Sequence, residues 1–237
     1  MSVWYAIPSI RPNGGTLMRW RARGYKLAVL RQGELIGADI EIATDVYLGW
    51  ARSVNILSKS ILSGDPTANW IVSGGDDYLP EMNQAPEEIA QRCTEHFGGT
   101  FGVMQPTGDR WGDDSVARAR WGENRGAMLD RIAGSPWMGR EWCERAYGGN
   151  GPMPEQYFHI FGDEQLQCVA EKLGVFWQCR DLMQYHDHAL RPRGNAADWP
   201  EFLRPIQAMW SQEQARFDAD KAAGLPGSDP LPPRIVP

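Results

Sequence analysis

The chain lacks any uninterrupted run of about 18 apolar residues, which is the length that a membrane-spanning helix requires. Its N-terminus has no basic stretch followed by a cleavage site, so no secretory signal is visible. The four cysteines are widely spaced and form no C-x-x-C pair, which disfavours zinc sites and disulfides. We therefore expect a cytoplasmic protein with free, buried thiols.

Positive charge is also scarce. Lysine and arginine number 24 against 30 aspartates and glutamates, which gives a formal net charge of −6. This balance argues against a protein that binds nucleic acid over its whole surface, although it leaves room for a local basic groove.

The apolar pattern of residues 1–105 switches repeatedly between the strand and the helix period. We expect strands at 3–10, 26–31, 70–72 and 101–105, separated by helices at 16–23, 45–61 and 86–97. Thr44 or Asp45 is the expected cap of the second helix. This alternation predicts an α/β fold with a mostly parallel central sheet flanked by helices.

The second half of the chain is less regular. Residues 106–131 show no convincing periodicity, and connections of that length are usually functional or disordered. We expect helices at 135–146, 163–173 and 202–217, the last interrupted near Pro205, and strand-like pieces at 175–179 and 182–185. The expected organisation is one domain at 1–190, with halves at 1–105 and 106–190, followed by a C-terminal helix and an irregular Pro/Gly-rich tail within 191–237.

The most informative segment is the apolar run Trp70–Val72, which leads into Gly74, Gly75, Asp76 and Asp77. A buried strand that ends in this way delivers carboxylates to the rim of a sheet. Adjacent carboxylates are costly to hold close together unless a cation lies between them. A divalent metal with oxygen ligands meets that need and can in turn hold a diphosphate. The alternative is a plain polar turn after a strand.

Further motifs stand before and after this segment. The first strand ends with Pro8, Ser9 and Arg11, and a helix carries Arg52 and Asn55. Asp163 and Glu164 open a later helix, and His186 and His188 flank an aspartate after a later strand. In this order the motifs resemble those of GT-A glycosyltransferases, especially the small family-two-like enzymes of bacteria and bacteriophages. The resemblance covers about residues 3–190.

The resemblance implies a GT-A, Rossmann-like sheet and a nucleoside-diphosphate sugar as donor, with UDP-sugar expected. It places the donor against Pro8, Ser9, Arg11, Arg52, Asn55, Gly75, Asp76 and Asp77. It assigns Mn²⁺ or Mg²⁺ to Asp77 and Asp76, together with His186 or His188. One departure is Gly75, where many members carry a further aspartate, so either Asp76 or Asp77 remains open as the main metal ligand.

The resemblance also implies a catalytic base. Asp163 is the first candidate and Glu164 the reserve, because a carboxylate near a helix N-terminus is held in its ionised form. Direct displacement with Asp163 as base would invert the configuration of the sugar, although retaining enzymes share this fold. The structural alternative for Asp163 is a plain helix cap.

The acceptor remains open between a hydroxymethylated DNA base and a glycan. Arginines and tryptophans interleave between Arg110 and Arg125, which suits nucleic acid, but neighbouring acidic residues cancel the charge. Trp111, Trp121 and Trp137 are candidate sugar platforms. The competing functions are a nucleotidyltransferase, disfavoured because no glycine-rich loop with a following basic residue stands near the first strand, and a non-catalytic sugar- or nucleotide-binding protein.

Overall fold

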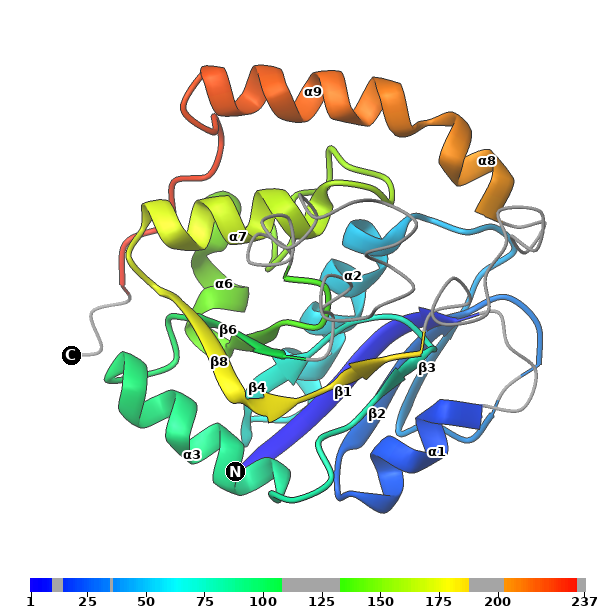
Figure 1. Cartoon of the computed structure of the whole chain (residues 1–237). Helices are drawn as coiled ribbons and strands as arrows, with labels where there is room; N and C mark the ends of the chain where they lie inside the picture. Colours follow the sequence, from blue (N-terminus) through cyan, green and yellow to red (C-terminus); the bar gives the residue numbers. More distant parts are fainter. Residues whose placement is uncertain (10–14, 35, 108–132, 188–202, 234–237) are drawn as a thin grey trace, which may run out of the picture.

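The computed structural model describes residues 1–9, 15–34, 36–107, 133–187 and 203–233 of the 237-residue chain. Its centre is a seven-stranded sheet (Figure 1). The strands follow the order β3 (Ile40–Ala43), β2 (Lys26–Arg31), β1 (Ser2–Ser9), β4 (Ala68–Val72), β7 (Trp137–Gly139), β6 (Val103–Thr107) and β8 (Phe176–Met183). All neighbouring pairs are parallel except those that β7 makes with β4 and β6. The predicted α/β architecture with a mostly parallel sheet is confirmed.

Helices cover both faces of the sheet because side chains of β1 alternate between them. Trp4 and Ala6 pack with α2 (Trp50–Gly64), α6 (Arg140–Gly149) and α7 (Gly162–Lys172). Val3, Tyr5 and Ile7 pack on the opposite face with α1 (Gly15–Ala22) and α3 (Pro86–Phe97). Figure 1 shows α1 and α3 below the sheet and the other three helices above it.

Several local predictions were wrong. The second helix begins at Trp50 rather than Asp45, because Gly49 has a φ of 88° and the carbonyl of Phe158 occupies the place of a Gly49 side chain. Val46, which lies within the expected helix, is outside the observed one and is 60% exposed. The helix expected from Ser135 begins only at Arg140, and β7 precedes it. Strand β3 was not predicted at all.

The antiparallel strand β7 depends on close backbone packing. A Cβ atom on Gly139 would overlap the carbonyl of Thr100, and the N–H of Gly139 donates to the carbonyl of Gly102. The strand thus fits only where glycine allows the chains to approach. A run of three residues is too short to show a strand period in the sequence, which explains why it was missed.

The C-terminal part folds as α8 (Leu203–Ala208) and α9 (Trp210–Ala222), which are separated at Met209 rather than at Pro205. Figure 1 shows α9 as the outermost element, above α7. The segment after α9 has no regular structure but is docked, because Leu225 and Ser228 are buried. None of the helices among the described residues is long and apolar enough to cross a membrane.

Candidate functional site

The loop after β4 is held from three directions at the carboxyl edge of the sheet. The hydroxyl of Ser9, the last residue of β1, donates to Oδ2 of Asp76 at 2.9 Å. The hydroxyl of Tyr5 donates to the carbonyl of Gly75 at 2.6 Å, and the indole N–H of Trp50 donates to the carbonyl of Gly74 at 3.0 Å. The adjacent strands β1 and β4 therefore bring two predicted motifs together, at the edge where α/β sheets bind ligands.

Asp77 meets His186 beside this loop. Strands β5 (Tyr78–Leu79) and β9 (Tyr185–His186) pair antiparallel, so that Tyr78 stands opposite His186 and their rings stack at 4.0 Å. Nε2 of His186 lies 3.4 Å from Oδ1 of Asp77. The N–H of Asp187 also donates to the carbonyl of Asp77 at 2.9 Å. The geometry of these two side chains is thus fixed by the backbone of both segments.

A carboxylate and an imidazole that face each other at this distance could also hold one ion between them. Two neighbouring ligands of an octahedral cation, each at 2.0–2.1 Å, lie about 3 Å apart. The observed 3.4 Å is close to that value, and both side chains are mostly buried. In the described part of the chain no group of three or more His, Cys, Asp or Glu side chains is arranged to hold a metal. His188 lies outside the described residues.

Gly75 leaves room for the carboxylate of Asp77. A Cβ atom on Gly75 would overlap Oδ1 of Asp77, which is the oxygen that faces His186. A larger residue at position 75 would therefore displace Asp77. This overlap is a physical reason for glycine at position 75.

The start of α7 packs against the same tryptophan as the aspartate loop. The position of a Gly162 side chain would lie 3.8 Å from the indole ring of Trp50, whose N–H binds Gly74. Asp163 is partly exposed in the first turn of α7, and its Oδ1 accepts the N–H of Glu164 at 2.9 Å. Glu164 is buried. Trp50 thus lies between the helix that carries Asp163 and the loop that carries Asp76 and Asp77.

The other predicted donor contacts lie in varied surroundings. Pro8 is partly exposed in β1, and Arg52 is exposed on α2. The buried side chain of Asn55 bonds to both backbone groups of Met153 and to the carboxylate of Glu155. Asn55 therefore fixes this loop in the structure. Arg11 lies outside the described residues.

Trp137 is not the sugar platform that the sequence suggested. Its ring is fully buried, and its N–H donates to the side chain of Gln184. Gln184 also donates its own N–H to Thr107 and its side-chain amide to the carbonyl of Ser135. These bonds anchor the chain on both sides of residues 108–132, which are not described and which include Trp111 and Trp121. They also fix Gln184 immediately before β9.

The structure also places His159, which is not among the candidate residues from the sequence, near the aspartate loop. Its Nδ1 lies 2.6 Å from the hydroxyl of Tyr47. Burial lowers the pKa of His159 to about 4, and the negative charge of Asp77 partly opposes this shift. Burial raises the pKa of Tyr47, and the charges of Glu213 and Asp76 raise it further. The one sequence feature that could have indicated a place near the site is that His159 stands shortly before the candidate base Asp163.

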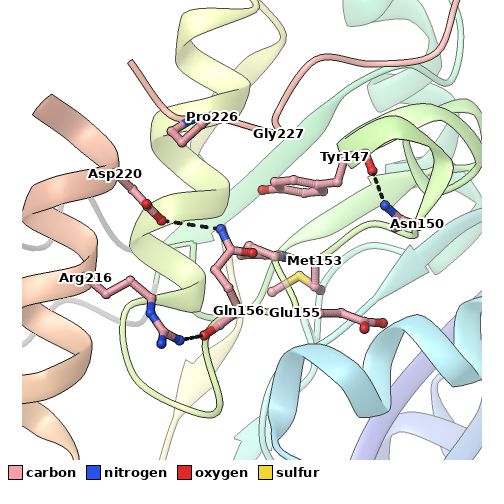
Figure 2. A pocket seen from close by; sticks show the side chains of 10 residues that line it. Tyr147, Asn150, Met153, Glu155, Gln156, Arg216, Asp220, Pro226 and Gly227 are labelled. Atoms are coloured by element: carbon pink, nitrogen blue, oxygen red, sulfur yellow. Dashed lines mark hydrogen bonds between the residues drawn. The ribbon is translucent and has the colours of Figure 1, made fainter. Parts of the chain in front are cut away.

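A cavity of about 410 Å³ lies elsewhere, between α9 and the loop after α6 (Figure 2). Asp220, Arg216 and Gln156 line it and bond to one another or to adjacent groups. Asn150 binds the carbonyl of Tyr147, and Glu155 binds Asn55. Its polar groups serve the packing of α9, and it contains none of the predicted site residues.

Comparisons with known proteins give distant likenesses only. No family model matches the sequence, and no curated protein matches it. Glucosyl-3-phosphoglycerate synthase from Mycobacterium tuberculosis, solved with Mn²⁺, UDP and phosphoglyceric acid, is 15% identical, with 83% of this chain and 72% of that chain covered and a TM-score of 0.46. A mutant Drosophila β1,4-galactosyltransferase 7, solved with manganese, UDP-Gal and xylobiose, is 12% identical. The match covers 86% of this chain and 80% of that chain, with a TM-score of 0.46. Likenesses this distant concern general shape alone.

Proposed function

We propose that this chain is a metal-dependent glycosyltransferase of the GT-A type, with a nucleoside-diphosphate sugar, specifically a UDP-sugar, as its donor. The observation that carries the proposal is the contact of Asp77 with His186 beside Asp76, at the carboxyl edge of a mostly parallel sheet. The start of α7, with Asp163, packs on the tryptophan that holds the same loop.

Asp77 and His186 are the residues that would hold Mn²⁺ or Mg²⁺. A carboxylate oxygen and a neutral imidazole suit such an ion, and two protein ligands leave room for diphosphate oxygens and water. A bound divalent ion supplies positive charge where the diphosphate leaves. Asp76, held by Ser9, adds negative charge next to Asp77 and strengthens the attraction for a cation.

Asp163 is the proposed base. The acceptor hydroxyl is a poor nucleophile and needs a carboxylate within hydrogen-bond reach. In the first turn of α7, Asp163 accepts the N–H of Glu164 and lies at the positive end of the helix dipole, and both favour the ionised form of this carboxylate. Proton transfer to Asp163 with direct displacement at the anomeric carbon would invert the configuration. Glu164 is the reserve base.

The nucleotide is proposed to lie along the end of β1. Pro8 and Ser9 belong to that end, Arg11 follows them in the sequence, and Arg52 is an exposed cation on helix α2. The acceptor is proposed to be either a glycan or a hydroxymethylated DNA base. Binding of DNA should weaken steeply with salt, because released counterions drive it, whereas binding of a neutral glycan should change little.

The test is incubation of the purified protein with UDP-sugars and Mn²⁺, with and without acceptors of both kinds. Release of UDP that requires metal, together with a glycosylated product, supports the proposal. Release of pyrophosphate would indicate a nucleotidyltransferase instead. Binding of UDP-sugar without any turnover would indicate a non-catalytic binding protein.

The role of Asp163 is tested in the same assay with Asp163→Asn. We expect transfer to fall by roughly 100-fold or more, because general-base catalysis contributes about 10²–10⁴-fold. Binding of UDP with Mn²⁺ should remain, because Asp163 does not contribute to the donor site. Full activity in this variant would move the base to Glu164.

A further inference from the structure

Glu213 on α9 reaches into the loop that precedes α7. The residue is only 4% exposed, although it belongs to the outermost helix. Its Oε1 accepts the N–H of Phe158 at 2.6 Å, and its Oε2 accepts the N–H of Ile160 at 2.7 Å. The N–H of His159 lies 3.5 Å from Oε2. One carboxylate thus binds three consecutive backbone N–H groups.

Hydrogen bonds from backbone N–H groups to a carboxylate are stronger than those between neutral groups, and three that converge fix a loop in one conformation. The next residue, Phe161, has a φ of 62°, a left-handed conformation that a bulky side chain adopts only when its surroundings enforce it. Phe161 is followed by Gly162 and Asp163. The carboxylate of Glu213 therefore acts on the backbone that sets where Asp163 begins.

The same helix holds the loop at further points. The guanidinium of Arg216 donates to the carbonyl of Gln156 (Figure 2). The hydroxyl of Tyr157 donates to Asp220 at 2.7 Å. Phe217 packs against Tyr157 and Phe161. Residues 156–161 are therefore held along the length of α9.

This loop is connected to the aspartate pair by direct contacts. The carbonyl of Phe158 accepts the N–H of Trp50 at 2.8 Å. The indole of Trp50 in turn binds the carbonyl of Gly74, two residues before Asp76. His159, whose neighbours bind Glu213, contacts Tyr47 on the other side.

We infer that Glu213 is a positioning residue that fixes residues 158–160 and thereby sets the place of Asp163 relative to the aspartate pair. The inference rests on the proposed function, because it assigns Asp163 to the reaction. If Glu213 has this role, α9 contributes to the proposed active site, although it lies beyond the expected domain of residues 1–190. Glu213 does not itself touch the substrate.

The test uses Glu213→Gln, which keeps the size of the side chain but removes its charge. We expect hydrogen exchange of the amides of residues 158–160 to accelerate at least tenfold. The kcat for transfer should fall by about 10–100-fold, because small misplacements of reacting groups have effects of that order. The dissociation constant of UDP with Mn²⁺ should change less than threefold, because the pairing of β5 with β9 and the bond from Asp187 to Asp77 hold Asp77 and His186 beside each other.

Two control variants separate positioning from general damage. Asp218→Asn removes an exposed carboxylate from the same helix and should leave kcat and exchange unchanged. Ile89→Val loosens the core on the opposite face of the sheet and shows how much kcat responds to lower stability alone. If Glu213→Gln does not fold, Glu213→Asp replaces it, since it keeps the charge on a shorter side chain. This variant should also lower kcat while it leaves the dissociation constant of UDP nearly unchanged.

Equal losses of kcat in Glu213→Gln and Ile89→Val at equal melting temperature would overturn the inference. Unchanged exchange of residues 158–160 would also overturn it. If the wild type shows no transfer, the proposed function fails, and the exchange measurement then decides alone whether Glu213 fixes this loop.

Discussion

Nε2 of His186 lies 3.4 Å from Oδ1 of Asp77, and the two-stranded pairing of β5 with β9 holds both residues in place. The contact joins Asp77, which follows β4, to His186 in β9, more than 100 residues later in the sequence. It gives the proposed metal site a rigid support on both sides.

Asp77→Ala should weaken the binding of UDP with Mn²⁺ by roughly 100-fold or more, since loss of an outer-shell partner alone costs 10–100-fold. His186→Ala should act in the same direction. Titration calorimetry with and without Mn²⁺ measures both. Asp187→Asn, an exposed neighbour, is the matched control. If Asp77→Ala instead prevents folding, the aspartate pair is structural.

Gly75→Ala should weaken metal-dependent UDP binding while the melting temperature changes little. The added Cβ would overlap Oδ1 of Asp77 and turn the carboxylate away from His186. Gly64→Ala is the control, because a Cβ there meets nothing within 4 Å. Equal UDP affinity in both variants would show that Asp77 does not need its observed position.

His159 should remain neutral in the folded protein until the pH approaches 4, because burial lowers its pKa to about 4. An unfolded histidine takes up its proton near pH 6.5. The stability that neutral His159 contributes is therefore complete above pH 6.5 and is lost as the pH falls toward 4. The titration of its ring by NMR gives the midpoint.

Tyr47→Phe tests the partner of this histidine. Burial keeps Tyr47 protonated, and we assign its hydroxyl as the donor to Nδ1, which favours neutral His159. The NMR midpoint of His159 should therefore rise in the variant. A midpoint that stays near 4 would leave burial as the sole cause.

Asp65 should make the fold sensitive to acid. Burial alone would raise its pKa, but hydrogen bonds from Lys26, Ser2, Thr67 and Trp4 lower it well below its usual range. Because the folded pKa is lowered, the stability from Asp65 is present above about pH 4 and is lost as the pH falls further. The free energy of unfolding, measured in urea across this range, should fall accordingly.

Asp65→Asn should lower the free energy of unfolding at pH 7 by about 1–3 kcal/mol, since an amide cannot accept all of these donors. It should also flatten the decline below pH 4. Asp218→Asn, on the exposed face of α9, should change neither quantity. An unchanged acid slope in Asp65→Asn would assign the sensitivity to other carboxylates.

The sequence by itself determined the elements whose pattern is local. The alternation of β1, the apolar run of β4 and the inner face of α3 are visible in neighbouring residues, so these elements were predicted at nearly their observed bounds. The candidate residues Asp76, Asp77, Asp163 and His186 were also visible in the sequence, because each stands near the end of a strand or at the start of a helix. Their roles remain proposals.

Only the tertiary structure decided what depends on contacts between distant segments. The start of α2 at Trp50 depends on the carbonyl of Phe158, and β7 is a strand because two longer strands flank it. Local periodicity contains no signal for such pairings. The contact of Asp77 with His186 and the hydrogen bonds of Glu213 to residues 158–160 likewise join residues that are distant in the sequence, and they form only after the chain has packed.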